Sequence, residues 1–101
     1  MEVPPPVGRL GVFLGSLTLL PAPEFRRELA ELDEMGYDTL WIGEAHGREA
    51  FTQSALALAA RHRITIATGI ASIWARDPVA MANAARTLDE AWPGRFVLGI
   101  G

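Results

Sequence analysis

The chain has 101 residues, half of them hydrophobic, which is enough to bury one modest core in a single domain over residues 1–101. Nine basic and twelve acidic side chains give a net charge of −3 without a run of either sign, so we expect neither nucleic acid nor a membrane surface as a partner. The lack of cysteine excludes disulfide bonds, a thiolate nucleophile and cysteine-based metal sites, and fits a cytoplasmic location.

An apolar opening stretch, Leu10 to Leu20, imitates a secretory signal. A signal peptide needs a basic region before its apolar core, whereas Glu2 and three consecutive prolines come first here. The stretch is also much shorter than the ~20 residues that a membrane span requires. We therefore expect it to belong to the fold.

Four short apolar runs are predicted to be strands. They are nearly continuous in apolar residues and do not alternate with polar ones, which is typical of strands covered on both faces of a parallel sheet. The runs are LGVFLG from Leu10, TLWIG from Thr39, ITIATGIA from Ile64 and FVLGIG from Phe96.

Helical periodicity fills the three intervals between these strands. The predicted third helix has the clearest start, because Asp77 is a natural N-cap and Pro78 suits the first helical position. Apolar residues recur at helical spacing in each interval and predict the buried faces. These residues are Phe25, Leu29, Leu32 and Met35 in the first helix, Phe51, Ala55, Leu58 and His62 in the second, and Met81, Ala85, Leu88 and Trp92 in the third.

The predicted fold class is α/β, with parallel β/α repeats. The strands begin about 25 to 32 residues apart, close to the ~31 residues per unit of an eight-unit barrel. Four strands and three helices would then form the first half of a TIM barrel. A small doubly wound domain of flavodoxin or receiver type is the alternative; it fits the length, but neither carboxylates nor a phosphate-cradling loop follow the first strand.

Ligands of such folds bind beyond the carboxyl ends of the strands. All four predicted ends carry glycine, at Gly15, Gly43, Gly69 and Gly99. These glycines either let a flat ligand approach the backbone or are ordinary turn residues. After the second strand, Glu44 and His46 are the only concentration of proton-transfer groups near a strand end, and they could serve as general acid and base.

Three segments resemble the luciferase-like monooxygenase superfamily of flavin and deazaflavin oxidoreductases. They are ELDEMGYDTLWIGEAH, TGIASIWARDP and NAARTLDEAWPGRFVLGIG. The stretch IASIWARDPVAMANAARTL is most similar to the branch that uses coenzyme F-420. The resemblance covers nearly everything from Leu10 to Gly101 and corresponds to the amino-terminal portion of these enzymes.

The resemblance implies a cofactor site at the strand exits. Members of the family often have a non-proline cis peptide at the end of the third strand, in a bulge that backs the cofactor ring. By motif this bond would join Gly69 to Ile70, with Ala71 next. Ser72, Trp74 and Arg76 resemble the loop that contacts the ribityl and phosphate portion, where Arg76 could pair with an anion. Trp74 could equally be a packing residue, and Gly99 would border the ring from the fourth strand.

The same resemblance implies a proton donor after the second strand. Family members commonly have a carboxylate followed by two histidines, or an aspartate–histidine pair, whereas this chain has Glu44, Ala45 and His46. We expect His46 to transfer the proton, with Glu44 as its neighbour.

The expected activity is hydride transfer between the deazaflavin coenzyme F-420 and a small organic substrate, with no metal. FMN is the alternative cofactor, in which case the protein would be an FMN-dependent monooxygenase. Family members are often homodimers. A non-catalytic half-barrel is the reading from another class, because the phosphate-binding elements of this architecture usually follow strands seven and eight.

Overall fold

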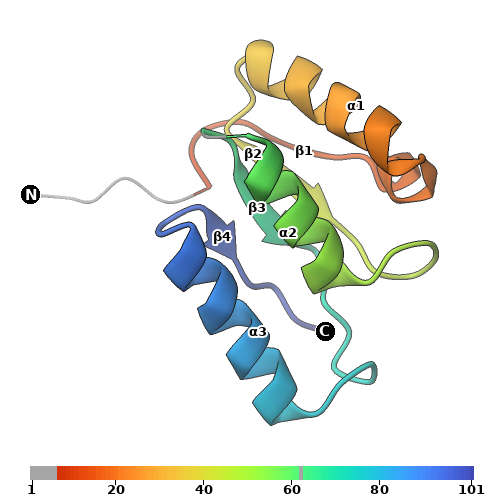
Figure 1. Ribbon diagram of the computed structural model, residues 1–101, viewed down its shortest axis with the longest axis vertical. Coiled ribbons are helices and arrows are strands. Elements are labelled where there is room, and N and C mark those ends of the chain that lie inside the picture. The colour runs from red at the N-terminus through yellow and green to blue at the C-terminus, as the bar shows by residue number, and fades with distance from the viewer. Residues whose placement is uncertain (1–6, 62) are drawn as a thin grey trace, which may run out of the picture.

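A computed structural model describes residues 7–61 and 63–101, so the predicted role of His62 lies outside the described residues. Strands and helices alternate along the chain as expected (Figure 1). The elements are β1 (Gly11–Phe13), a 3-10 helix η1 (Gly15–Leu19), α1 (Ala22–Glu34), β2 (Thr39–Ile42), α2 (Ala50–Ala60), β3 (Thr65–Thr68), α3 (Pro78–Ala91) and β4 (Phe96–Val97). The predicted α/β class with four strands and three helices is confirmed, while η1 was not predicted.

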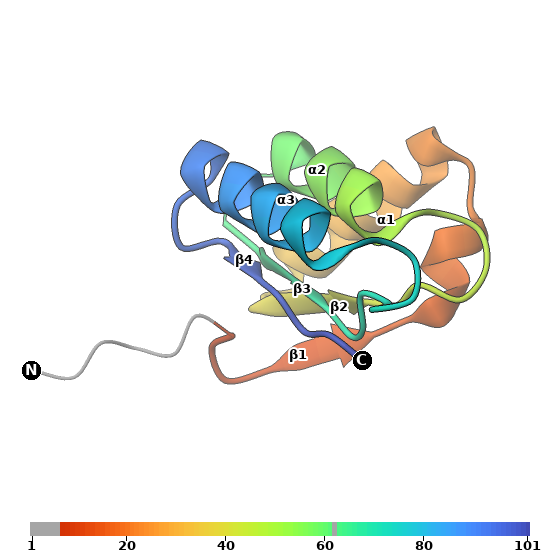
Figure 2. The same cartoon turned by 90° about the horizontal axis from the view of Figure 1, so that it is seen from below.

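The four strands form one parallel sheet in chain order, β1-β2-β3-β4. All three α-helices lie on the same face of this sheet, as Figure 2 shows. A doubly wound domain instead places helices on both faces and reverses its strand order at a switch point. The strand order and the one-sided helical layer therefore exclude the flavodoxin or receiver alternative for the described residues.

The register sorts the strand side chains between the two faces of the sheet. Val12, Leu40, Ile66 and Phe96 are register partners across the four strands and face the helices. Leu40 and Ile66 are fully buried there. Apolar side chains of the helices complete the core: Phe25, Leu29, Leu32, Phe51, Ala57, Leu58, Met81 and Leu88.

The opposite face of the sheet is covered unevenly. All four residues of β3 are buried, as predicted for a strand covered on both faces. The expectation was wrong for β1, where Phe13 is 56% exposed. β1 is an edge strand of the described sheet, with β2 as its neighbour on one side, so its outward-facing residues have less to pack against.

The helices follow the predicted patterns, with one correction at a helix end. Asp77 caps α3, because its carboxylate accepts a hydrogen bond from the Ala80 amide at 2.9 Å. Met35 was predicted to be buried, but it is 69% exposed. It is the C-cap of α1 and so lies past the helical turns that pack on the sheet. Ala55, Ala85 and Trp92 are partly buried against the core.

None of the helices described is both long enough and apolar enough to cross a bilayer.

The chain leaves β3 through a cis peptide bond between Gly69 and Ile70, at the position that the family resemblance implied. Pairing with the β4 segment resumes beyond it: the Ala71 amide donates to the Gly99 carbonyl at 2.8 Å and the Ile73 amide to the Gly101 carbonyl at 2.8 Å. The Thr68 hydroxyl also donates to the Gly99 carbonyl, at 2.8 Å. The exits of β3 and β4 therefore form one hydrogen-bonded unit.

Gly99 is required by close backbone approach, and its replacement tests this unit. A Cβ atom at Gly99 would lie 2.2 Å from the Thr68 carbonyl oxygen, which no side-chain rotation can relieve. We expect Gly99→Ala to lower the free energy of unfolding by about 3 kcal/mol, the upper part of the range for overpacking. Gly15→Ala is the control, because its Cβ would meet only Phe13, at 3.7 Å. Urea denaturation measures both, and equal stabilities would contradict the assigned contact.

Candidate functional site

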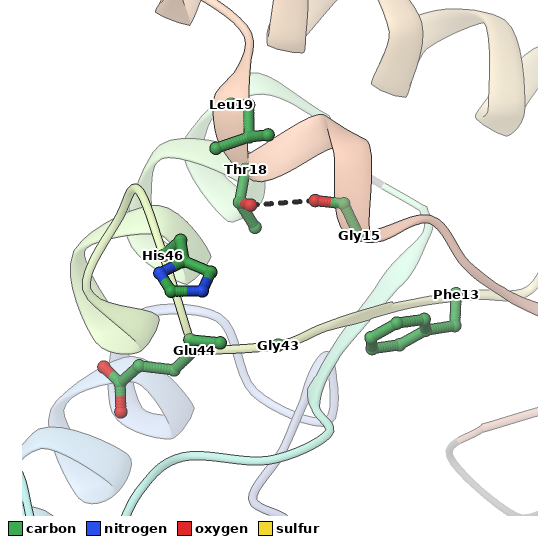
Figure 3. Close-up of a pocket in the computed structure, with 8 residues that line it drawn as sticks. Phe13, Gly15, Thr18, Leu19, Gly43, Glu44 and His46 are labelled. Atoms are coloured by element: carbon green, nitrogen blue, oxygen red, sulfur yellow. Dashed lines mark hydrogen bonds between the residues drawn. The ribbon is translucent and has the colours of Figure 1, made fainter.

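The carboxyl ends of β1 and β2 enclose an open pocket of about 240 Å³ (Figure 3). Parallel strands end at the same edge of a sheet, so loops that are distant in sequence meet there. The lining residues are Phe13, Gly15, Thr18, Leu19, Gly43, Glu44, Ala45 and His46. The pocket thus combines an aromatic ring, an aliphatic side chain and an imidazole.

The two predicted proton-transfer residues point in different directions. The His46 imidazole stands at the pocket, with the Phe13 ring across from it, whereas the Glu44 carboxylate points away (Figure 3). No hydrogen bond joins these two side chains in the described structure, although both residues line the pocket. Ala45 lies between them in a loop that bends from residue 45 to residue 48, and Glu44 has other partners.

Glu44 accepts hydrogen bonds from three residues in two parts of the fold. Its Oε2 atom accepts from the Ala50 amide at 2.7 Å, at the start of α2. Its Oε1 atom accepts from the Ser72 amide at 2.9 Å, in the loop after β3. The Arg76 guanidinium approaches Oε2 at 2.5 Å, and both side chains are only 11% exposed.

Both terminal nitrogens of Arg76 have partners in the described structure. Besides Glu44, it contacts the Glu49 carboxylate at 2.9 Å and donates to the Ser72 carbonyl at 2.9 Å. Its guanidinium carbon lies 5.1 Å from the centre of the Phe51 ring, a cation–π distance. The resemblance assigned this arginine to an anionic part of the cofactor, but in the described structure two carboxylates already neutralise it.

The hydrogen bonds set the charge state of this cluster. Burial tends to raise the pKa of Glu44, but the hydrogen bonds from Arg76, Ala50 and Ser72 outweigh burial and lower that pKa. The hydrogen bond with Glu44 raises the pKa of Arg76. Glu44 is therefore a carboxylate at neutral pH, and it is poorly suited to donate a proton.

The loop after β3 presents an aromatic side chain to solvent. The Ser72 hydroxyl accepts from the Trp74 amide at 3.1 Å. The Trp74 side chain is 90% exposed, which excludes the packing alternative within the described structure. Ile70, next to the cis bond, is 43% exposed. An apolar surface is thus available beside the strand ends.

The wall of the pocket that η1 forms is held against the loop after β2. The Arg48 guanidinium donates to the carbonyls of Thr18, at 3.1 Å, and Leu20. Gly47 has φ +90°, and a Cβ atom there would lie 2.5 Å from the Thr18 carbonyl oxygen. These contacts hold η1 against the segment that carries His46.

Several pocket and loop residues were not predicted as site residues. Phe13, Thr18 and Leu19 line the pocket from β1 and η1. Arg48 and Glu49 follow His46 in the sequence. Arg48 binds carbonyls of Thr18 and Leu20, and Glu49 contacts Arg76 besides capping α2, so local sequence patterns carry no signal for these distant contacts.

The family model described as luciferase-like monooxygenase matches residues 9–101, nearly the whole chain. The chain belongs to the luciferase-like monooxygenase family. The family resemblance seen in the sequence is therefore confirmed.

Two curated relatives match this chain, and their names give different activities. A Mycobacterium tuberculosis protein assigned as a coenzyme F-420-dependent oxidoreductase is 34% identical over 93 residues, which are 92% of this chain and 27% of that protein. The 4-hydroxyprotoasukamycin monooxygenase of Streptomyces nodosus subsp. asukaensis is 42% identical over 81 residues, 73% of this chain and 22% of that protein. The chain thus spans about a quarter of the length of these relatives.

Solved structures agree on the fold. The coenzyme F-420-dependent tetrahydromethanopterin reductase of Methanopyrus kandleri matches with a TM-score of 0.75 and 22% identity, over 91% of this chain and 26% of that chain. The monooxygenase RslO1 of Streptomyces bottropensis matches with a TM-score of 0.71 and 23% identity, over 92% of this chain and 32% of that chain. The four-stranded unit of this luciferase-like chain therefore corresponds to part of larger enzymes.

The lowered pKa of Glu44 predicts a pH-dependent contribution to stability. An unfolded glutamate titrates near ~4.3, so the contribution is complete above about pH 5 and is lost as the pH falls through the lower pKa of the folded state. At pH 7 we expect Glu44→Gln to cost about 3 kcal/mol, near the lower limit for breaking a buried ion pair. Urea denaturation from pH 7 to pH 3 should show this difference shrinking in acid.

The control is Glu31→Gln on the exposed side of α1. Its effect should be small and nearly independent of pH. A Glu44→Gln penalty that persists unchanged at pH 3 would show that the ionised carboxylate is not what stabilises the fold.

Proposed function

We propose that the protein is an oxidoreductase that transfers a hydride between the deazaflavin coenzyme F-420 and a small organic substrate. One observation carries the proposal. The strand exits end in glycine residues, and they lie beside a pocket that is lined by the imidazole of His46. The F-420-dependent relative, which matches 92% of this chain, supports the same cofactor. The complete activity would require a closed barrel, of which this chain would supply the first half. A homodimer and a cytoplasmic location are also part of the proposal.

The residues at the strand exits fit a flat ring system. Gly43 and Gly69 place no side chain between the exposed parts of Phe13 and Ile70, and a Cβ at Gly43 would lie 3.2 Å from the Phe13 ring. Gly69, Ile70 and Ala71 would back the ring, and Gly99 would border it from β4. Ser72 and the exposed Trp74 would lie beside the attached chain of the cofactor.

The chemistry divides between cofactor and protein. When bound, the deazaflavin supplies or accepts the hydride at C5. His46 would give a proton to the substrate atom next to the carbon that receives the hydride, which balances a two-electron reduction. The Phe13 and Leu19 side chains would exclude water from one side of the reacting atoms.

An FMN-dependent monooxygenase is the second candidate, and two observations favour it. The monooxygenase relative is 42% identical over its matched range, and a monooxygenase structure shares the fold. The glycine-lined exits also leave room for an isoalloxazine ring.

A parallel fluorescence titration with F-420 and FMN tests the choice of cofactor. We expect saturable binding of F-420 to the folded protein and much weaker binding of FMN, after circular dichroism has shown that the protein is folded. Preferential FMN binding would favour the monooxygenase candidate. If neither cofactor binds, the proposal fails and a non-catalytic role gains support.

Replacement of His46 tests its assigned role. We expect His46→Ala to lower kcat by about 10²- to 10⁴-fold, the usual contribution of a general acid, while the Kd of the cofactor changes little. Oxidation of reduced F-420 with a panel of conjugated enones is the assay, because enone reduction consumes one hydride and one proton. Arg26→Ala, on the exposed side of α1, is the control. Unchanged turnover in His46→Ala would remove this residue from the reaction.

A further inference from the structure

Strands β2 and β3 separate where the chain leaves the sheet. The Gly69 amide donates to the Ile42 carbonyl at 2.7 Å, and in the described structure this is the last backbone hydrogen bond between the two strands. On its other side the β3 segment continues to pair, through the amides of Ala71 and Ile73. The backbone of Ser72, which lies between these two residues, faces the side that β2 has left.

Two side chains occupy the place of the missing strand at Ser72. In a parallel sheet, one residue donates its N–H to a carbonyl of the neighbouring strand and accepts from an N–H two residues further along that strand. Here the Ser72 amide donates to Glu44 Oε1 at 2.9 Å, and the Ser72 carbonyl accepts from Arg76 at 2.9 Å. The carboxylate thus replaces a backbone carbonyl, and the guanidinium replaces a backbone amide.

We propose that Glu44 and Arg76 are positioning residues that act as a one-residue substitute strand and hold the exit of β3 in place. The consequence for cofactor binding rests on the proposed function, because that segment would back the ring. Glu44 is then not an acid or base of the reaction, and Arg76 is not a ligand of a cofactor phosphate.

Neighbouring residues hold the side chains of Glu44 and Arg76 in place. Glu44 is tied to the first turn of α2 by the Ala50 amide, at 2.7 Å. Arg76 is held between Glu49, at 2.9 Å, and the Phe51 ring. Glu49 is itself the N-cap of α2. The exit of β3 is therefore fastened to the start of α2, a helix that is anchored in the core through Phe51 and Leu58.

The charge balance of the cluster disfavours anion binding by Arg76. One guanidinium faces two carboxylates, and both members of the Glu44–Arg76 pair are 11% exposed. A phosphate that approached Arg76 would have to displace a carboxylate and would meet the remaining negative charge. A positioning role uses the same contacts without displacing any of them.

A double-mutant cycle separates the two roles. The variants are Glu44→Ala, Arg76→Ala and the double replacement, with Glu31→Gln as the surface control, and circular dichroism checks that each is folded. If an alanine variant does not fold, Glu44→Gln and Arg76→Lys replace it, because they keep the size of each side chain. The Kd is measured for F-420 or FMN, whichever the unaltered protein binds, at several sodium chloride concentrations.

We expect each single variant to weaken cofactor binding by roughly ten- to a hundredfold, the range for residues that orient a binding group. The double variant should bind the cofactor with about the same Kd as the single variant that binds it less tightly, because both replacements break the same unit. The salt dependence of binding should not change, since no contact with a phosphate is lost. The proposal is overturned if Arg76→Ala alone weakens binding and flattens the salt dependence while Glu44→Ala does not.

Hydrogen exchange provides a readout that needs no cofactor. The Ser72 amide should exchange faster in Glu44→Ala and in Arg76→Ala than in the unaltered protein, while Glu31→Gln leaves it unchanged. Unaltered exchange at Ser72 in both variants contradicts the substitute strand. If the unaltered protein binds neither cofactor, the proposed function fails, but the exchange measurement still decides whether the pair holds this segment.

Discussion

The candidate site depends on the in-order pairing of four parallel strands. Because β1 to β4 are neighbours in chain order, each exit loop lies beside the next one, and all four open at the same edge of the sheet. This arrangement brings Glu44 to Ser72 and Arg76, and Thr18 to Gly47. The helices contribute from one side only, so they fasten the loops without covering the other face of the sheet (Figure 2).

The electrostatic organisation separates groups that hold the site from groups that face the pocket. Glu44, Glu49 and Arg76 balance one another among backbone donors and acceptors, and the hydrogen bonds keep the pKa of Glu44 low. His46 stands at the pocket, and the Glu44 carboxylate points away from it (Figure 3). A charged network beside a site can thus have a structural purpose, even when its residue types are those of acid–base chemistry.

The sequence predicted the strands, the helices and the start of α3, because those features depend on neighbours within a few residues. Asp77 and Pro78 begin α3 by local hydrogen bonding and backbone geometry. The cis bond at Gly69 came from the family resemblance and not from local propensity. The exposure of Phe13 and Met35 depends on where the sheet and α1 end, which periodicity does not encode. Ser72 and Arg76, which bind Glu44, and the carbonyls that bind Arg48 lie roughly thirty residues away along the chain, so composition and spacing gave no sign of these contacts.

The Gly47–Arg48 segment has a consequence for how this pocket could diversify. Gly47 touches the Thr18 carbonyl so closely that no larger residue fits, and Arg48 binds the carbonyls of η1. The separation between the two walls is therefore set by backbone contacts, and the loops cannot drift apart gradually without losing them. New ligand preferences would arise most readily by exchanging the side chains at Phe13 and Leu19, which project into the space between fixed walls. Proteins selected for a different ligand should therefore differ at those two positions and keep the glycine and the arginine.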